Sequence, residues 1–393
     1  MKFLSLCLLM LTILGCATNG QNVTCRVGVQ QSLIEDRIEQ VLGGSPARIS
    51  ILALSAGGEW GAFGAGFLKG WSSTERFADH RLTYEIVTGV SAGALLATYA
   101  FLGKEFDDHL EYFRSVRDDD VFRKRLFPLY FFSSSMNDTS RLREYLRHRL
   151  SEKLPGSNET ILDKVEQAGR NNRLLLVGAV NTKSGLFESF DLTKIATMKD
   201  PERTECYAAA LMASSAIPGV FSPVLINDDM YVDGGARAHV FIARISDLIA
   251  MKRIPRQQRI MRIIVNGDLA PDREQPKRRL VPIALRAVEL MTDQVLYDSV
   301  DRLLDERHVS RAARSSSTGN ATPMTWDTRF VYAKNVPQQC QLIDSNRRKG
   351  VLFFPEFESC LFDYGLKLGK GSENPWETEL PSRPPLATPS LQE

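Results

Sequence analysis

Apolar positions along the chain fall into short runs and into longer segments with helical spacing. Runs at 49–54 and 174–181 are mostly apolar, and a shorter run at 84–88 contains the β-branched residues Ile86, Val87 and Thr88, which predicts three strands. Segments at 62–71 and 92–102 follow the first two runs and have the spacing of amphipathic or buried helices. Strand, loop, helix, strand, turn and helix therefore alternate. This order predicts an α/β fold with a mainly parallel central sheet flanked by helices.

The rest of the chain continues this mixture of strands and helices up to Lys370. We expect strands at 186–192, 230–232, 259–266 and 328–333, and helices at 31–42, 106–154, 205–214, 280–311 (one or two) and 356–369. Beyond Lys370 the chain is rich in Pro and Glu, which predicts disorder. No internal repeat is present.

The first residues have the pattern of an export signal. Met1-Lys2 gives a positive start, Phe3–Leu14 is almost entirely apolar, and Gly15-Cys16 follows. Ile13-Leu14-Gly15-Cys16 also resembles a bacterial lipobox, which implies that Cys16 carries lipid and becomes the mature N-terminus. Ala17 then implies attachment to the outer membrane, facing the periplasm. The alternatives are an ordinary signal peptide with an incidental cysteine, or a short membrane anchor.

These observations divide the chain into five expected regions. They are a lipoprotein signal peptide (1–15), a tether with a short helix (16–47), a main α/β domain (48–267), a C-terminal helical extension packed on that domain (268–369) and a disordered tail (370–393).

Composition adds limits rather than a function. The 393 residues have a formal net charge of +2 and are 43% hydrophobic, which suits one large globular domain or two ordinary ones. This near-neutral balance gives no electrostatic reason to expect a nucleic-acid partner.

Four cysteines remain after the signal and the lipidation site: Cys25, Cys206, Cys340 and Cys360. An even number in an exported chain predicts two disulfides, for which three connectivities are possible. We favour Cys340–Cys360, because it closes the shortest loop outside the core. Reduced, buried cysteines are the alternative. Their spacing to histidines does not predict a metal site.

The sharpest motif is Gly89-Val90-Ser91-Ala92-Gly93, between the strand at 84–88 and the helix at 92–102. A strand that turns at once into a helix forces the turn residue into a strained conformation, and glycines on both sides prevent clashes. Such a turn exposes Ser91 Oγ at the positive end of the helix. The motif therefore predicts a nucleophilic serine, although a glycine-flanked turn without function has the same spelling.

A serine nucleophile needs a base, and no histidine is well placed in the sequence. His308 lies in a charged helical segment, and His239 follows Asp233 by only six residues. Asp233 comes directly after the strand at 230–232 and is followed by Gly234-Gly235, so its carboxylate can be aimed at a neighbouring strand end. Taken alone, Asp-Gly is more often a turn.

A glycine loop, Ser55–Gly61, joins the first strand to the first helix. Its spacing comes within one residue of a dinucleotide-binding fingerprint, with Glu85 as the possible ribose ligand. Alternatively, the N–H groups of Gly57 and Gly58 lie free at a helix N-terminus and bind an oxyanion.

Read in order, the glycine loop, the Gly89–Gly93 turn and Asp233-Gly234-Gly235 resemble the layout of the patatin-like phospholipases. Residues 213–223 resemble the segment that precedes the aspartate strand in that family, so the resemblance covers about 48–266. It implies the three-layer patatin-like fold and hydrolysis of acyl esters by a Ser-Asp dyad without histidine.

The resemblance also implies a role for each matching residue. Ser91 corresponds to the nucleophile, Asp233 to the general base, and Gly57 and Gly58 to the oxyanion donors. The glycines that support these motifs are Gly61, Gly89, Gly93, Gly234 and Gly235. Two residues depart from the family pattern: Ala56 replaces the first loop glycine, and Trp60 replaces a basic residue. These departures bear on substrate class more than on the dyad.

The implied partners are an acyl-lipid substrate, either a phospholipid or a lysophospholipid, and a membrane reached through Cys16, with no cofactor. The aromatic cluster Phe127–Phe132 is either a membrane-contacting flap or core, and the basic run Arg141–Arg149 more simply a solvated helix face. Two other functions stay open. They are a nucleotide-binding α/β protein and a catalytically impaired lipoprotein that binds lipid or protein.

Overall fold

A computed structural model gives the three-dimensional structure of the chain. It describes residues 22–28, 31–43, 48–74, 81–124, 135–242, 259–269, 280–312 and 326–381. The signal peptide with Cys16, the aromatic cluster Phe127–Phe132 and the last twelve residues of the predicted tail (382–393) lie outside the described residues.

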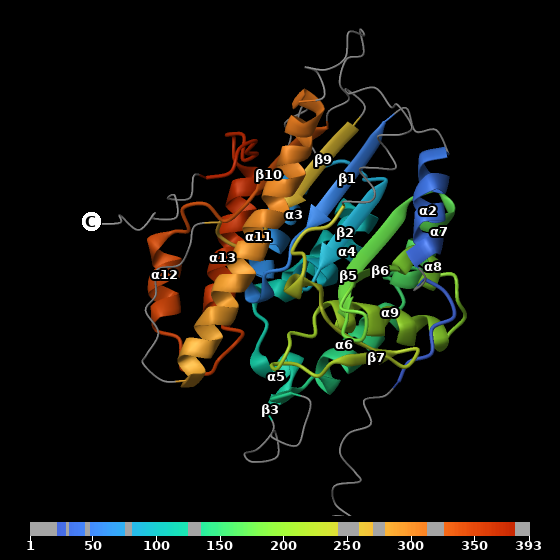
Figure 1. The fold of residues 1–393 in the computed structure, drawn as a ribbon, viewed down its shortest axis with the longest axis horizontal. Coiled ribbons are helices and arrows are strands. Elements are labelled where there is room, and N and C mark those ends of the chain that lie inside the picture. Colours follow the sequence, from blue (N-terminus) through green and yellow to red (C-terminus); the bar gives the residue numbers. More distant parts are fainter. Residues whose placement is uncertain are drawn as a thin grey trace, which may run out of the picture.

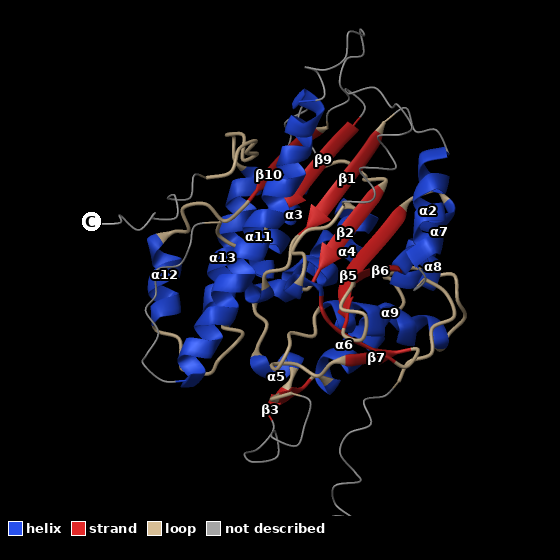
Figure 2. Ribbon diagram, in the orientation of Figure 1, coloured by secondary structure: helices blue, strands red, loops and turns tan. Residues whose placement is uncertain are grey.

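One large sheet runs through the molecule (Figures 1 and 2). Its strands follow the order β10-β9-β1-β2-β5-β8-β7, and β6 also pairs with β5. The first five strands of this order are parallel, whereas β6 and β8 run antiparallel to β5. The strands are β1 (Ile49–Leu54), β2 (Ile86–Val90), β5 (Leu174–Asn181), β6 (Phe187–Asp191), β7 (Val224–Ile226), β8 (Asp229–Asp233), β9 (Arg259–Ile264) and β10 (Asp327–Val331).

Helices cover both faces of this sheet. Strand β1 illustrates why, because Leu52 and Leu54 belong to one apolar core while Ile51 and Ala53 belong to a second core on the opposite face. The first core is closed by α3 (Gly61–Ser72), α4 (Ala92–Leu102), α7 (Ile161–Arg170), α9 (Glu202–Ser214) and α13 (Pro355–Lys370). The second is closed by α2 (Gln31–Gly43) and α11 (Leu280–Ala312), which lie apart in Figure 1, with α11 on the left and α2 on the right. The predicted three-layer α/β architecture is confirmed.

The predicted continuous helical region at 106–154 is wrong. It divides into a 3-10 helix η3 (Lys104–Arg114), a short α5 (Asp118–Val121), a hairpin of β3 (Arg123–Lys124) and β4 (Asn137–Asp138), and α6 (Ser140–Ser151). The division is local, since the backbone of Arg117 and the side chain of Asp120 cap the start of α5. Helix α7 and helix α12 (Gln338–Ser345) were not predicted, although Thr160 and Asp163 form a capping box that marks the start of α7.

The C-terminal extension is not only helical, because its strand β10 joins the sheet beside β9. Its last helix, α13, packs directly against α3 through glycines on both helices. A Cβ atom on Gly66 of α3 would lie 2.0 Å from the Phe362 carbonyl oxygen, and one on Gly365 of α13 would lie 2.2 Å from the Phe63 carbonyl oxygen. Gly70 and Gly369 make the same kind of approach one turn further along. The two backbones therefore touch, which fixes the extension on the central α/β region.

Both ends of the described chain are held more firmly than expected. Val23, in the predicted tether, pairs with Ile226 at the sheet edge, and Cys25 forms a disulfide with Cys206 of α9. The predicted Cys340–Cys360 disulfide is confirmed, and it joins α12 to α13.

The segment just beyond Lys370 also differs from the expected disordered tail. Trp376 is 5% exposed and packs edge-on against Phe67 and Trp71 of α3. Glu377 exchanges two backbone hydrogen bonds with Phe330 of β10. The apolar contacts of one tryptophan order a segment whose composition is otherwise polar.

Candidate active site

The site lies where β2 turns into α4. Ser91 occupies that turn with φ 53° and ψ −124°, a conformation that non-glycine residues rarely adopt. The flanking glycines are required by contact: a Cβ atom on Gly89 would lie 2.5 Å from the Gly93 carbonyl oxygen, and one on Gly93 would lie 2.4 Å from that of Leu54. The turn therefore has the geometry expected of a nucleophile elbow, with Ser91 at the N-terminus of α4.

Two serines at the end of α9 hold this turn in place. The Ser91 N–H donates to Ser214 Oγ (3.0 Å), and the Ser214 hydroxyl donates to the Gly178 carbonyl oxygen in β5 (2.6 Å). The Ser215 hydroxyl donates to the Ser91 carbonyl oxygen (3.3 Å). Neither serine was predicted as a site residue, although both lie in the 213–223 segment that resembles the family.

Asp233 ends strand β8, which pairs with β5 at Ala179. Its Oδ1 accepts a hydrogen bond from the Gly235 N–H (2.7 Å), and the side chain is only 5% exposed. Burial raises the pKa of Asp233 from its ordinary value of 3.8 to about 6, while the Ser91 hydroxyl and the Gly235 N–H hold it from rising further by hydrogen bonding to the carboxylate. The structure thus brings Ser91 and Asp233 together from positions far apart in the sequence.

The glycine loop also reaches the site, since Gly58 lines the same pocket as Ser91. Within the described part of the chain, neither the Gly57 nor the Gly58 N–H donates a hydrogen bond to another residue. A Cβ atom on Gly57 would lie 1.9 Å from the Asn266 carbonyl oxygen, and Gly58 has a φ of +55°. Both positions therefore require glycine, and both leave donors available for an anion.

The loop is anchored by polar contacts at the end of β9. Asn266 donates from its backbone N–H to Ser55 Oγ (2.8 Å) and from its Nδ2 to the Ser55 carbonyl oxygen (2.6 Å). The Ala56 N–H donates to the His239 carbonyl oxygen (3.0 Å). Ala56, which stands where the family has glycine, is accommodated as a buried residue facing Gly235.

A cation reaches the loop from the C-terminal extension. Trp60, which stands where a basic residue is typical, packs edge-on against Phe357. Beside it, Arg347 Nη2 lies 2.6 Å from Oε1 of Glu59, with its guanidinium carbon 5.4 Å from the centre of the Phe357 ring. Burial raises the pKa of Glu59 to about 7 even though Arg347 opposes this rise. Arg347 was not predicted, since nothing in its local sequence links it to the loop.

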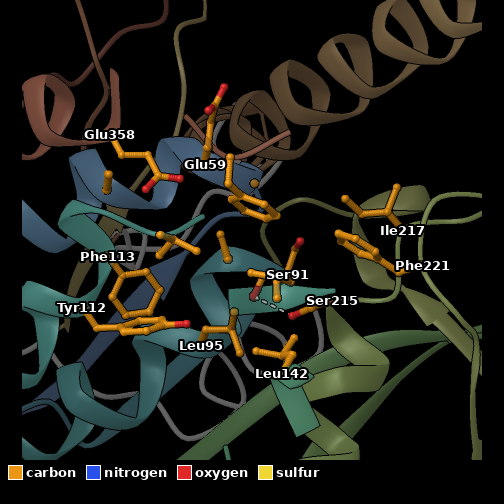
Figure 3. A pocket seen from close by; sticks show the side chains of 16 residues that line it. Glu59, Ser91, Leu95, Tyr112, Phe113, Leu142, Ser215, Ile217, Phe221 and Glu358 are labelled. Carbon is orange, nitrogen blue, oxygen red and sulfur yellow. Dashed lines mark hydrogen bonds between the residues drawn. The ribbon is translucent and has the colours of Figure 1, made fainter. Parts of the chain in front are cut away.

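Ser91 opens into a pocket, here called the Ser91 pocket, which holds about 600 Å³ of space including its open mouth. Its walls are mostly apolar and come from several helices and from the segment after α9 (Figure 3). The extension supplies Phe353 and Glu358, and η3 supplies Tyr112 and Phe113. The remaining lining residues are Gly58, Glu59, Ala62, Ser91, Ala92, Leu95, Val116, Val121, Leu142, Ser215, Ile217 and Phe221. No lysine, arginine or histidine is among the lining residues, so the pocket suits an apolar group better than a phosphate.

His239 is a weaker candidate than Asp233 for the base that accepts the Ser91 proton. His239 is buried, and burial lowers its pKa to about 4, so its ring is neutral at physiological pH. Neither ring nitrogen has a hydrogen-bond partner among the described residues. The side chain of His308, in α11, is not described.

The described residues show neither a metal-binding cluster nor a membrane-spanning helix. They contain no cluster of three histidine, cysteine or acidic side chains arranged to hold a metal ion. Within the same ranges, no helix combines the length and the apolar character that a membrane span requires. The basic run Arg141–Arg149 is engaged in ion pairs on the surface of α6, such as Arg147 with Glu205, as expected for a solvated helix face.

Comparison with known proteins gives a family for the central part of the chain. Residues 52–244 match the family model described as patatin-like phospholipase. The chain is similar in structure to VipD from Legionella pneumophila, with 12% identity, a TM-score of 0.40, and coverage of 83% of this chain and 66% of VipD. It is also similar to human GIVD cytosolic phospholipase A2, with 11% identity, a TM-score of 0.35, and coverage of 86% and 61%. The chain thus spans less than two thirds of the length of either protein. A search of curated proteins finds no match.

Proposed function

Because residues 52–244 match the patatin-like phospholipase family model, we propose that this part of the chain is a patatin-like serine acyl hydrolase that cleaves carboxylic esters of lipids. The observation that carries the proposal is the approach of the Ser91 hydroxyl to the buried Asp233 carboxylate at the mouth of an apolar pocket. Phospholipids and lysophospholipids are the proposed substrates, with the acyl chain in the Ser91 pocket.

In the proposed first step, Asp233 accepts the Ser91 hydroxyl proton while Oγ attacks the ester carbonyl carbon. The carbonyl oxygen becomes an oxyanion, which the free N–H groups of Gly57 and Gly58 stabilise. When this intermediate collapses, the bond to the alcohol breaks, Asp233 returns the proton to the departing oxygen, and the acyl group stays on Ser91.

In the second step, water attacks the acyl-enzyme. Asp233 accepts a proton from the water, and the same N–H groups stabilise the second oxyanion. Collapse breaks the bond to Ser91 Oγ, which takes the proton back from Asp233, and the fatty acid leaves. A carboxylate with a pKa of about 6 suits both proton transfers, because it is ionised at neutral pH and is a stronger base than an exposed aspartate.

A fluorophosphonate probe tests the nucleophile, because it labels only activated serines. We expect the purified protein to be labelled and to hydrolyse a short-chain nitrophenyl ester, and Ser91→Ala to lose both. Ser345→Ala, which removes an exposed hydroxyl at the end of α12, is the control and should still be labelled. If Ser91→Ala hydrolyses the ester as fast as the wild type, the proposal fails. If the wild type is not labelled, the pocket belongs instead to a lipid- or protein-binding module.

We also propose that the protein is a lipoprotein, anchored through Cys16 to the outer membrane and facing the periplasm. Support comes from the lipobox-like residues Ile13–Cys16 and from the two disulfides, since disulfides persist in oxidising compartments. Metabolic labelling with an alkyne fatty acid should mark the wild type, and Cys16→Ser should abolish the label and release the protein from membranes. Labelling that survives in Cys16→Ser would refute this assignment.

A further inference from the structure

Two polar side chains face the interior of the Ser91 pocket without satisfying their hydrogen-bonding groups. Glu358, in α13, is 1% exposed, and neither of its carboxyl oxygens has a normal hydrogen-bond partner among the described residues. The Tyr112 hydroxyl, from η3, is also buried and unpaired within those residues. Figure 3 shows both groups pointing into the pocket from one side, with Ser91 across from them.

Leaving such groups unpaired in an apolar pocket is energetically costly, because neither protein nor water replaces their hydrogen bonds. Burial, with a smaller contribution from the nearby Glu59 carboxylate, raises the pKa of Glu358 to about 9, although the Val116 backbone and Arg347 oppose this rise. Burial likewise raises the pKa of Tyr112. At neutral pH both groups are therefore uncharged and can each donate a hydrogen bond.

The ligand that fits these donors is neutral. The lining residues include two carboxyl groups and no basic side chain, so a phosphate or free carboxylate would meet no opposite charge there. The apolar walls of Leu95, Leu142 and Phe221 suit a hydrocarbon. A hydrocarbon with one oxygen atom part of the way along it would satisfy both kinds of surface.

We propose that the Ser91 pocket selects acyl groups that carry a hydroxyl, held by Tyr112 and Glu358. The inference rests on the proposed acyl hydrolase function, because it places the acyl chain in this pocket. Tyr112 and Glu358 act as specificity-determining residues and take no part in the chemistry at Ser91. The plain acyl chain is disfavoured because it leaves both donors unpaired.

The first test compares nitrophenyl esters of octanoic acid with hydroxyoctanoic esters that carry the hydroxyl at successive positions. We expect kcat/KM to be about tenfold higher for one of the hydroxylated esters than for the plain ester, the value of one buried hydrogen bond. Tyr112→Phe and Glu358→Leu should each lower kcat/KM for the hydroxylated ester and raise it for the plain ester. Glu358→Gln, which keeps a donor and an acceptor, should retain most of the preference.

Two matched variants separate this effect from general disturbance. Tyr145→Phe removes the hydroxyl of the ring stacked on Tyr112 (centroids 4.2 Å apart), but Tyr145 does not line the pocket. Glu356→Gln changes an exposed carboxylate in the same helix as Glu358. Both should keep the wild-type ratio between the two esters. Equal rates for plain and hydroxylated esters at every position would overturn the inference while leaving the hydrolase intact.

A binding measurement keeps the inference testable if no ester is cleaved. Calorimetric titration with octanamide and hydroxyoctanamides, which are neutral, should show the same preference for a hydroxylated chain, and Tyr112→Phe should abolish it. Loss of ester cleavage with this preference retained would refute the proposed hydrolase but support the pocket assignment. Equal binding of the plain and hydroxylated amides by the wild type would refute the pocket assignment.

Discussion

The buried carboxylate of Asp233 should make the protein less stable at neutral pH than it would be without that charge. Its pKa of about 6 lies above the ordinary value of 3.8 that it regains on unfolding. The folded state therefore holds the proton more tightly, so this group stabilises the fold at acidic pH and the benefit is lost as pH rises toward 6. The difference between pKa 3.8 in the unfolded state and about 6 in the folded state lowers the free energy of unfolding by about 3 kcal/mol as pH rises from below 3.8 to above 6.

Asp233→Asn tests this reasoning, because the amide is similar in size and carries no charge. Its Oδ1 can still accept from the Gly235 N–H, and its Nδ2 can donate to Ser91 Oγ. At about pH 8 the variant should have a free energy of unfolding about 3 kcal/mol higher than the wild type, and near pH 4 most of that gain should be absent. The same variant should have lost ester hydrolysis.

Urea denaturation at the two pH values, followed by tryptophan fluorescence, measures both differences. Asp229→Asn changes a partly exposed carboxylate at the start of the same strand, and it serves as the control. If Asp233→Asn is no more stable than the wild type at about pH 8, or if its gain is equal at both pH values, burial of the charge does not have the assigned cost.

Four further measurements test other parts of the structure. Wild-type kcat/KM should fall about tenfold per pH unit below a midpoint near 6, because Asp233 must be ionised to act as base; a flat profile between pH 5 and 7 would exclude it. His239→Gln should keep most of the activity, since the ring is neutral, and a loss as large as that of Asp233→Asn would assign catalysis to histidine. Gly365→Ala should lower the free energy of unfolding by about 1–3 kcal/mol, because its Cβ would collide with the backbone of α3. Gly371→Ala, whose Cβ would have its nearest contacts at 3.4 Å, should change the free energy of unfolding little. Replacing both Cys340 and Cys360 by serine should cost about 2–4 kcal/mol in thermal or urea denaturation, and an unchanged midpoint would argue against the crosslink.

The sequence predicted those parts of the site whose geometry is local. The Gly89–Gly93 turn could be identified because strand, glycine, serine, glycine and helix are consecutive, and the clashes that require the glycines involve near neighbours or the adjacent strand. Asp233 could be predicted as a site residue only from the order of the three motifs, because Asp-Gly by itself is a common turn. The parallel sheet was predictable because apolar runs and helical segments alternate along the chain.

The remaining features depend on contacts between residues far apart in the sequence. Arg347 reaches Glu59 from almost three hundred residues away, and Glu358 looks like an ordinary acidic residue in the first turn of an exposed helix. Ser214 and Ser215 resemble ordinary residues at the end of a helix. Only the packing of α9 against the Ser91 turn shows that they hydrogen-bond to Ser91. The polar composition beyond Lys370 predicted disorder because it gave no sign that Trp376 would pack on α3. That packing orders the segment around Trp376.

The glycine contact between α3 and α13 has a consequence for how this protein could diverge. Ser91 and Asp233 lie within the matched domain, whereas Phe353 and Glu358 lie beyond it on the segment that the glycines fasten in place. Substitutions in α13 could therefore retune which acyl groups are accepted without altering any group that performs the chemistry. Relatives that keep the three motifs but carry a different C-terminal helix would then share the proposed reaction and differ in acyl-group specificity. Exchanging that helix between two such relatives should transfer the acyl-group specificity.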